Sequence, residues 1–82
     1  MRPTRKIKIR KLRQWAGGLR GRCHANGFIE IDPRQDEQDF LDTLLHELLH
    51  RELPDLDEQA VIRVAERLAW EMWKLDYRRV RA

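Results

Sequence analysis

The first third of the chain has the two-residue periodicity of β-strands. Polar and apolar residues alternate over residues 6–10, which predicts a strand with one buried face. Two further extended segments, 19–23 and 28–32, lie on either side of Asn26-Gly27, and an Asn-Gly pair in that position is a strong signal for a β-hairpin. We therefore expect a small antiparallel sheet of two or three strands.

Helical periodicity replaces this alternation after Asp36, which we expect to cap the first helix. The helix should end near Leu53, because Pro54 cannot continue it. Six apolar side chains fall within one half of this helix: Phe40, Leu41, Leu44, Leu45, Leu48 and Leu49. That half of the helix should face the core.

A second helix is predicted from about Leu56 to the region of Tyr77, with Asp55 as its cap. Its apolar residues recur at helical spacing and should cover the first helix: Val61, Ala65, Leu68, Met72 and Leu75, flanked by Ile62, Ala69 and Trp73. We therefore expect an α+β fold in which two packed helices follow the small sheet. One domain should take up residues 1–82.

The composition narrows the class of protein. A chain of 82 residues has a hydrophobic core that is only marginally sufficient, so a bound metal would help to hold the fold. The apolar stretches are too short to cross a membrane, and the N-terminus lacks the apolar block of a signal peptide. The single cysteine, Cys23, cannot form an internal disulfide, which agrees with a reducing compartment. These features predict a cytoplasmic protein.

Positive charge is concentrated at the two ends of the chain, although the net charge is only +3. The cations of the N-terminal end are Arg2, Arg5, Lys6, Lys8, Arg10, Lys11 and Arg13. We expect residues 1–5 to form a basic arm that need not be ordered. This charge allows two interpretations: a solvated face, or a nucleic-acid-binding module in which the arm contacts phosphates and Trp15 stacks on a base.

The candidate chemistry lies in residues 46–50, which read His-Glu-Leu-Leu-His and fit the zinc-protease pattern His-Glu-x-x-His. Residues four apart share a face of a helix, so His46 and His50 can direct imidazole nitrogens at one metal ion. Both lie near the middle of the half opposite the leucines, where a histidine that merely fills the core would not fall. The alternative is two ordinary solvent-exposed histidines.

A zinc site needs a third protein ligand, and the residues after His50 favour a carboxylate. A corner near Pro54 would bring Glu58 to a height similar to that of His50. Asp57 is a rival ligand one step round the helix, and Glu66 lies roughly 12 Å farther along it. Glu58 could instead complete a capping box with Asp55, in which its carboxylate only satisfies a backbone N–H.

These segments resemble a known family. Residues 44–50, 54–58 and 60–68 look like the active-site and glutamate helices of gluzincin metallopeptidases, in particular the minimal zincin-like proteins of phages and bacteria. The resemblance implies that His46, His50 and Glu58 bind one zinc ion and that Glu47 is the general base. It also implies that an extended peptide substrate pairs along residues 21–31.

Such a ligand set predicts zinc-dependent hydrolysis of peptide bonds. Zinc lowers the pKa of its bound water to about 7, Glu47 takes the proton, and the same carboxyl returns it to the leaving amine. His24, Tyr77 or an arginine could stabilise the oxyanion. Two alternatives remain: a zinc-stabilised protein without catalysis, and a DNA-associated protease, since SprT-like zincins act on proteins bound to DNA.

Overall fold

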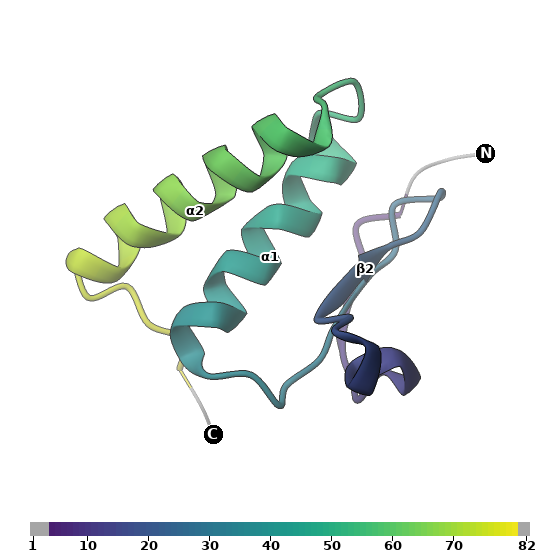
Figure 1. Ribbon diagram of the computed structural model, residues 1–82, viewed down its shortest axis with the longest axis horizontal. Helices are drawn as coiled ribbons and strands as arrows, with labels where there is room; N and C mark the ends of the chain where they lie inside the picture. Colours follow the sequence, from purple (N-terminus) through teal and green to yellow (C-terminus); the bar gives the residue numbers. More distant parts are fainter. Residues whose placement is uncertain (1–3, 81–82) are drawn as a thin grey trace.

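The computed structural model describes residues 4–80, and a three-stranded sheet opens the fold (Figure 1). The strands are β1 (Ile7–Ile9), β2 (Gly21–Cys23) and β3 (Ile29–Ile31), arranged in the order β1-β3-β2. A 3-10 helix, η1 (Arg13–Gly17), lies between β1 and β2 in the chain. Two α-helices, α1 (Glu37–Glu52) and α2 (Glu58–Lys74), follow the sheet, which confirms the expected α+β fold.

The sheet is mixed rather than antiparallel throughout. β2 pairs antiparallel with β3 around the Asn26-Gly27 turn, as predicted, and Gly27 adopts a φ of 92° that favours glycine. β1 pairs parallel with β3, so the expectation that every pair runs antiparallel is wrong. The chain reaches this arrangement because β3 returns between β1 and β2, a strand order that alternation within each segment does not encode.

The prediction that β1 has one buried face is also wrong. Ile7 and Ile9 lie level with Ile29 and Ile31 of the neighbouring strand, yet they remain 43% and 48% exposed. The reason is the position of α1, which contacts β2 and β3 but makes no comparable contact with β1 among the described residues. β1 is therefore an edge strand whose apolar side chains extend beyond the helix that covers its neighbours.

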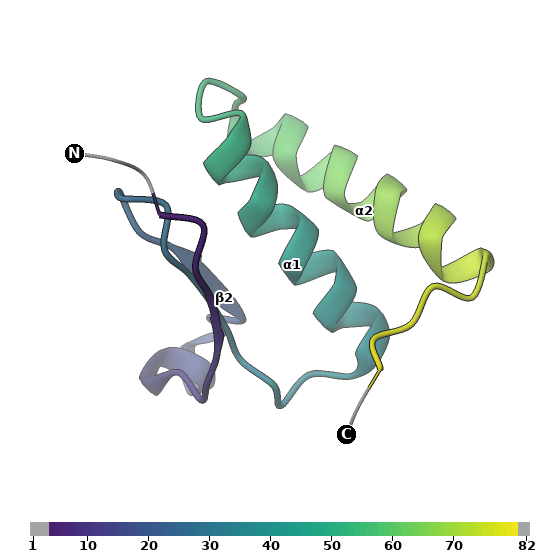
Figure 2. The same cartoon turned by 180° about the vertical axis from the view of Figure 1, so that it is seen from behind.

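The helix α1 forms the middle layer of the molecule, between the sheet and α2 (Figures 1 and 2). It begins at the predicted cap, where the Asp36 carboxylate accepts a hydrogen bond from the Asp39 N–H at 2.8 Å, and it ends at Leu53 as expected. Toward the sheet it buries Phe40 against the two isoleucines of β3, with Leu44 and Leu48 packed beside them. The predicted leucine face thus meets the core, although its leucines are only half-buried.

The helix α2 packs on α1 through a narrower stripe than the sequence predicts. Its buried residues are Val61, Ala65 and Ala69, whereas Leu68 and Leu75 remain exposed. The buried residues are spaced four apart and so form one line along α2, and Leu68 and Leu75 lie to the sides of that line. No helix of the described residues is long and apolar enough to span a membrane.

Thr4, the first described residue, lies beside the hairpin. The Thr4 N–H donates a hydrogen bond of 2.7 Å to the carbonyl of Asn26, and Arg5 is exposed. Residues 1–3 of the expected basic arm lie outside the described residues, as do residues 81–82.

The carboxylate of Asp32, directly after β3, connects this strand to Leu12 and Arg34 through hydrogen bonds. Asp32 is fully buried, and its oxygens accept hydrogen bonds from the Leu12 N–H at 2.7 Å and the Arg34 N–H at 2.9 Å. The Arg34 guanidinium adds two more bonds, at 3.0 and 2.7 Å. These donors favour the ionised carboxylate and hold the pKa of Asp32 well below its usual range.

We expect Asp32→Asn to lower the free energy of unfolding by about 1–3 kcal/mol at pH 7, since it removes a charged acceptor from buried donors. The folded-state pKa is depressed, so the carboxylate stabilises fully above the ordinary pKa of Asp, about 3.9, and this contribution is lost as the pH falls further. Urea unfolding at pH 7 and pH 3 measures both effects. The exposed Asp55→Asn is the control, expected within about 0.5 kcal/mol of wild type.

A difference between Asp32→Asn and wild type that is as large at pH 3 as at pH 7 would contradict this account.

Candidate metal centre

The two histidines of the motif converge on one side of α1. The Nε2 atoms of His46 and His50 lie 3.1 Å apart, and both side chains are partly buried. This proximity follows from their spacing of four residues on a regular helix, which places their rings one above the other.

Glu58 completes a cluster of three. Its Oε1 lies 3.0 Å from His46 Nε2, and its Oε2 lies 2.9 Å from His50 Nε2. The three donor groups are all within 4.8 Å of one another and could hold a metal ion. The structure therefore brings together the three residues that the sequence predicts as ligands.

The beginning of α2 explains how Glu58 reaches the histidines. The cap of α2 is Asp57, whose Oδ1 accepts a hydrogen bond from the Ala60 N–H at 2.8 Å, so the prediction of Asp55 as the cap is wrong. Glu58 is consequently the first residue of the helix rather than the fourth member of a capping box. Its carboxylate points back to α1, whereas the carboxylate of the rival Asp57 is engaged with its own helix.

The donor set suits zinc, the metal that the resemblance implies. Two imidazole nitrogens and one carboxylate are typical ligands of a catalytic zinc site, which keeps its fourth position open. Both histidines present Nε2 to the cluster. In the described part of the chain, no residue forms a hydrogen bond with their Nδ1 atoms, so their orientation depends on α1 and on the cluster itself.

Glu47 lies beside the cluster without a partner of its own. Its side chain projects from α1 toward the sheet and is only 8% exposed, and no described residue forms a hydrogen bond or ion pair with its carboxyl group. Burial raises the pKa of the Glu47 carboxyl, as does the nearby Glu58, while the two histidines lower it. A buried carboxylate with a raised pKa is suited to accept a proton.

Two hollows meet at Glu47. The first, of about 350 Å³, is lined by Glu47 and His46 together with the acidic residues Asp42 and Glu66. The second, of about 660 Å³, is lined by Glu47 and His50 and extends to Cys23 and Arg51. Glu66, the remaining candidate ligand, borders the first hollow and is not part of the three-residue cluster.

Of the predicted oxyanion donors, the structure separates Tyr77 from the site. Tyr77 lines a different hollow, beside Phe40 and Trp73. His24 borders the second hollow, but its Nε2 is 2.7 Å from Glu30 Oε1 on the outer side of the sheet. Arg20 lines the first hollow and Arg51 the second, so arginine is the candidate type that the structure places beside the cluster.

Gly21 is a positioning residue that the sequence did not reveal. A Cβ at Gly21 would lie 2.6 Å from Thr43 Cγ2 and 3.2 Å from Glu47 Cγ. The Thr43 hydroxyl donates a hydrogen bond of 2.7 Å to Gln35 Oε1, which holds that side chain in place. The absent side chain thus lets β2 lie directly on the part of α1 that carries Glu47. A glycine at the start of a strand was the only sequence signal.

No protein-family model, curated protein or solved structure matches this chain. The likeness to gluzincins therefore rests on the motif around His46 and His50 and on the cluster that they form with Glu58.

We expect Gly21→Ala to destabilise the fold by about 1–3 kcal/mol, because the added methyl group overpacks the contact between β2 and α1. Gly17→Ala is the matched control: no atom lies within 4 Å of its added Cβ, so it should be neutral or slightly stabilising. Thermal and urea unfolding would measure the free energy of unfolding of both variants relative to wild type. Equal effects of the two alanines would show that Gly21 has no special packing role.

We expect the protein to bind one equivalent of zinc. Glu58→Gln should weaken the affinity for zinc by more than roughly 10–100-fold, which is the loss expected when a residue that only supports a ligand is changed. Asp57→Asn should bind zinc like wild type, because asparagine caps a helix as well as aspartate does. Titration with a competing chelator measures the affinity, and the zinc-induced rise in the unfolding temperature gives an independent readout. Loss of zinc in Asp57→Asn with retention in Glu58→Gln would reverse the assignment of the third ligand.

Proposed function

We propose that this protein is a zinc-dependent metallopeptidase that hydrolyses a peptide or protein substrate. The observation that carries the proposal is the convergence of His46, His50 and Glu58 beside Glu47, a buried residue that borders both hollows and whose carboxyl group has no hydrogen-bond partner among the described residues. A structural metal site has no need of a further carboxyl group beside its ligands. A hydrolytic site needs one to accept the proton of the attacking water.

The proposed mechanism divides the work between a metal and one acid–base group. Zinc held by His46, His50 and Glu58 would lower the pKa of a water molecule and polarise the substrate carbonyl. The Glu47 carboxylate then accepts a proton from the attacking water and delivers it to the nitrogen of the leaving amine. Burial raises the pKa of this carboxyl group, which makes its carboxylate a stronger proton acceptor than that of an exposed glutamate.

The sheet offers a place for the substrate backbone. β2 is an edge strand, and Gly21 and Cys23 each border a hollow that reaches Glu47. An extended peptide can add to such an edge through main-chain hydrogen bonds. Within the residues 21–31 named by the resemblance, β3 is the central strand and already pairs on both sides, so the pairing surface is limited to residues 21–23.

We expect Glu47→Gln to keep its zinc but to cleave peptides about 10²–10⁴-fold more slowly, the usual contribution of a general base. Glu66→Gln, which changes another carboxylate of the first hollow, is the control and should stay near wild type. Zinc-loaded protein would be incubated with a diverse peptide mixture and the new termini identified by mass spectrometry.

Wild-type protein that binds zinc but yields no cleavage above the level of Glu47→Gln would leave a zinc-stabilised, non-catalytic protein as the better description.

A further inference from the structure

The outer side of the sheet, turned away from the helices, carries a row of cations. Lys8 and Arg22 stand on either side of Glu30 in the register of the three strands, so all three side chains project from the same side. This side is opposite to that of Ile29 and Ile31, which pack against α1.

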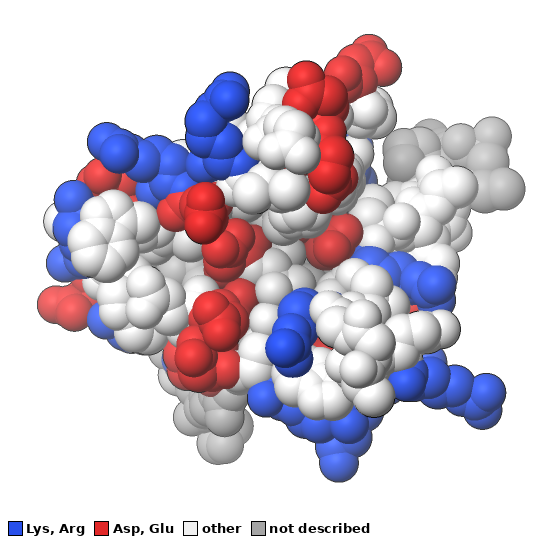
Figure 3. Space-filling view, in the orientation of Figure 1, with Lys and Arg blue, Asp and Glu red and all other residues white. Residues whose placement is uncertain are grey.

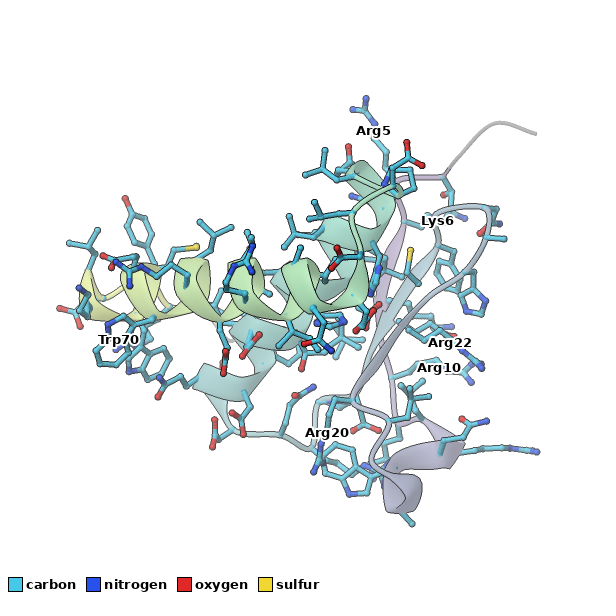
Figure 4. The ribbon with its side chains drawn as sticks, turned by 45° about the horizontal axis from the view of Figure 1, so that its top comes forward. Arg5, Lys6, Arg10, Arg20, Arg22 and Trp70 are labelled. Carbon is cyan, nitrogen blue, oxygen red and sulfur yellow. The ribbon has the colours of Figure 1, made fainter. Side chains whose placement is uncertain are left out.

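Alternation along the chain extends the row, because Lys6 and Arg10 each lie two residues from Lys8. We call Lys6, Lys8, Arg10 and Arg22 the basic sheet face. Figure 4 shows Lys6, Arg10 and Arg22 on the side of the sheet away from the helices.

The positive charge of this face is largely uncompensated. Its central carboxylate, Glu30, is buried and already paired, with Arg10 Nε at 2.8 Å and His24 Nε2 at 2.7 Å. Lys6, Lys8 and Arg22 are exposed and form no ion pair with any described residue. Three cations are therefore available to an external anion.

Flat side chains lie at the hairpin and in η1. His24 and Phe28 stack with ring centroids 5.3 Å apart, next to the hairpin turn. In η1, the Trp15 ring lies 4.0 Å from the Arg20 guanidinium and 4.8 Å from that of Arg34. Cations beside aromatic and guanidinium planes are the combination with which proteins bind single-stranded nucleic acids.

We propose that the basic sheet face binds the phosphate backbone of a nucleic acid. Side chains two residues apart on a strand are about 7 Å apart, so the free cations Lys6 and Lys8, with Arg22 across the sheet from Lys8, suit a chain of successive phosphates better than an isolated anion. Binding to such a polyanion is strengthened by the release of condensed counterions. The four residues of the basic sheet face are all cationic and offer no amphipathic helix, which disfavours a lipid surface.

This interaction is separate from the proposed peptidase site. The cluster of His46, His50 and Glu58 lies on the helices, whereas the basic sheet face is on the far side of the sheet from α1. In Figure 3 acidic residues gather in the middle, and basic residues lie both at the lower right, around the strands and η1, and at the upper left, over α2. A nucleic acid would therefore leave the metal cluster accessible.

The test compares two double variants with the same loss of charge. Lys8→Gln/Arg22→Gln removes two cations of the basic sheet face, and Arg63→Gln/Arg67→Gln removes two exposed cations of α2. Fluorescence anisotropy with a labelled single-stranded 20-nucleotide DNA and its duplex would be measured from 25 to 200 mM salt. We expect the slope of log K against log salt to fall by about 1.8 for duplex, or about 1.4 for the single strand, only in the sheet variant.

Three results would overturn the proposal. The first is that wild-type protein binds neither DNA at the lowest salt. The second is that both double variants weaken binding equally, which would reflect net charge alone. The third is that Lys8→Gln/Arg22→Gln weakens binding to phosphatidylserine vesicles but not to DNA. Circular dichroism checks that each variant is folded, and Lys6→Gln/Lys8→Gln replaces the sheet variant if Arg22→Gln does not fold. Glu47→Gln, which should slow cleavage without loss of zinc, should leave DNA binding unchanged, so this proposal and the peptidase proposal can fail independently.

Discussion

The fold depends on one helix that serves two partners at once. α1 contacts both the sheet and α2, whereas α2 contacts no other helix or strand in the described part of the chain. The fully buried residues of α2 are Val61, Ala65 and Ala69, so its attachment depends on α1 alone. In a chain of 82 residues there is no larger core to compensate. A further link between α1 and α2 would therefore stabilise the whole molecule.

The candidate metal centre occupies the place where such a link is most effective. Two of its donors come from α1 and the third from the first residue of α2, immediately after the corner at Pro54. A metal ion bound there would join the two helices as well as supply chemistry, because binding to the folded state alone adds to its stability. Stability and the proposed activity would then depend on the same three side chains, with Glu47 as the member that serves the chemistry alone.

The buried carboxylates Glu30, Asp32 and Glu47 differ in their partners. Glu30 and Asp32 face cations and backbone donors that keep them ionised. Glu47 has neither, and its pKa is raised instead of lowered. The same fold thus contains buried carboxylates held as structural anchors and one left free to exchange a proton, a contrast that follows from their partners rather than from their burial.

Local periodicity was sufficient to predict the elements, since a strand or helix is set by the spacing of residues close in the chain. It predicted the hairpin at Asn26-Gly27, both α-helices, the cap at Asp36 and the placement of His46 and His50 on one face. It could not rank competing caps two residues apart, so it selected Asp55 where Asp57 caps α2. Nor could it show which apolar face would find a partner, and it buried β1 residues that α1 leaves exposed.

By itself, then, the sequence determined the α+β class and the pair of histidines, because four residues of helix bring two side chains together whatever surrounds them. Glu58 was a candidate by spacing, but only the packing of α2 on α1 placed its carboxylate within 3.0 Å of both imidazoles. The parallel pairing of β1 and the requirement for Gly21 were likewise decided by tertiary structure. Each is a contact between segments distant in the chain, and no local pattern records such a distance.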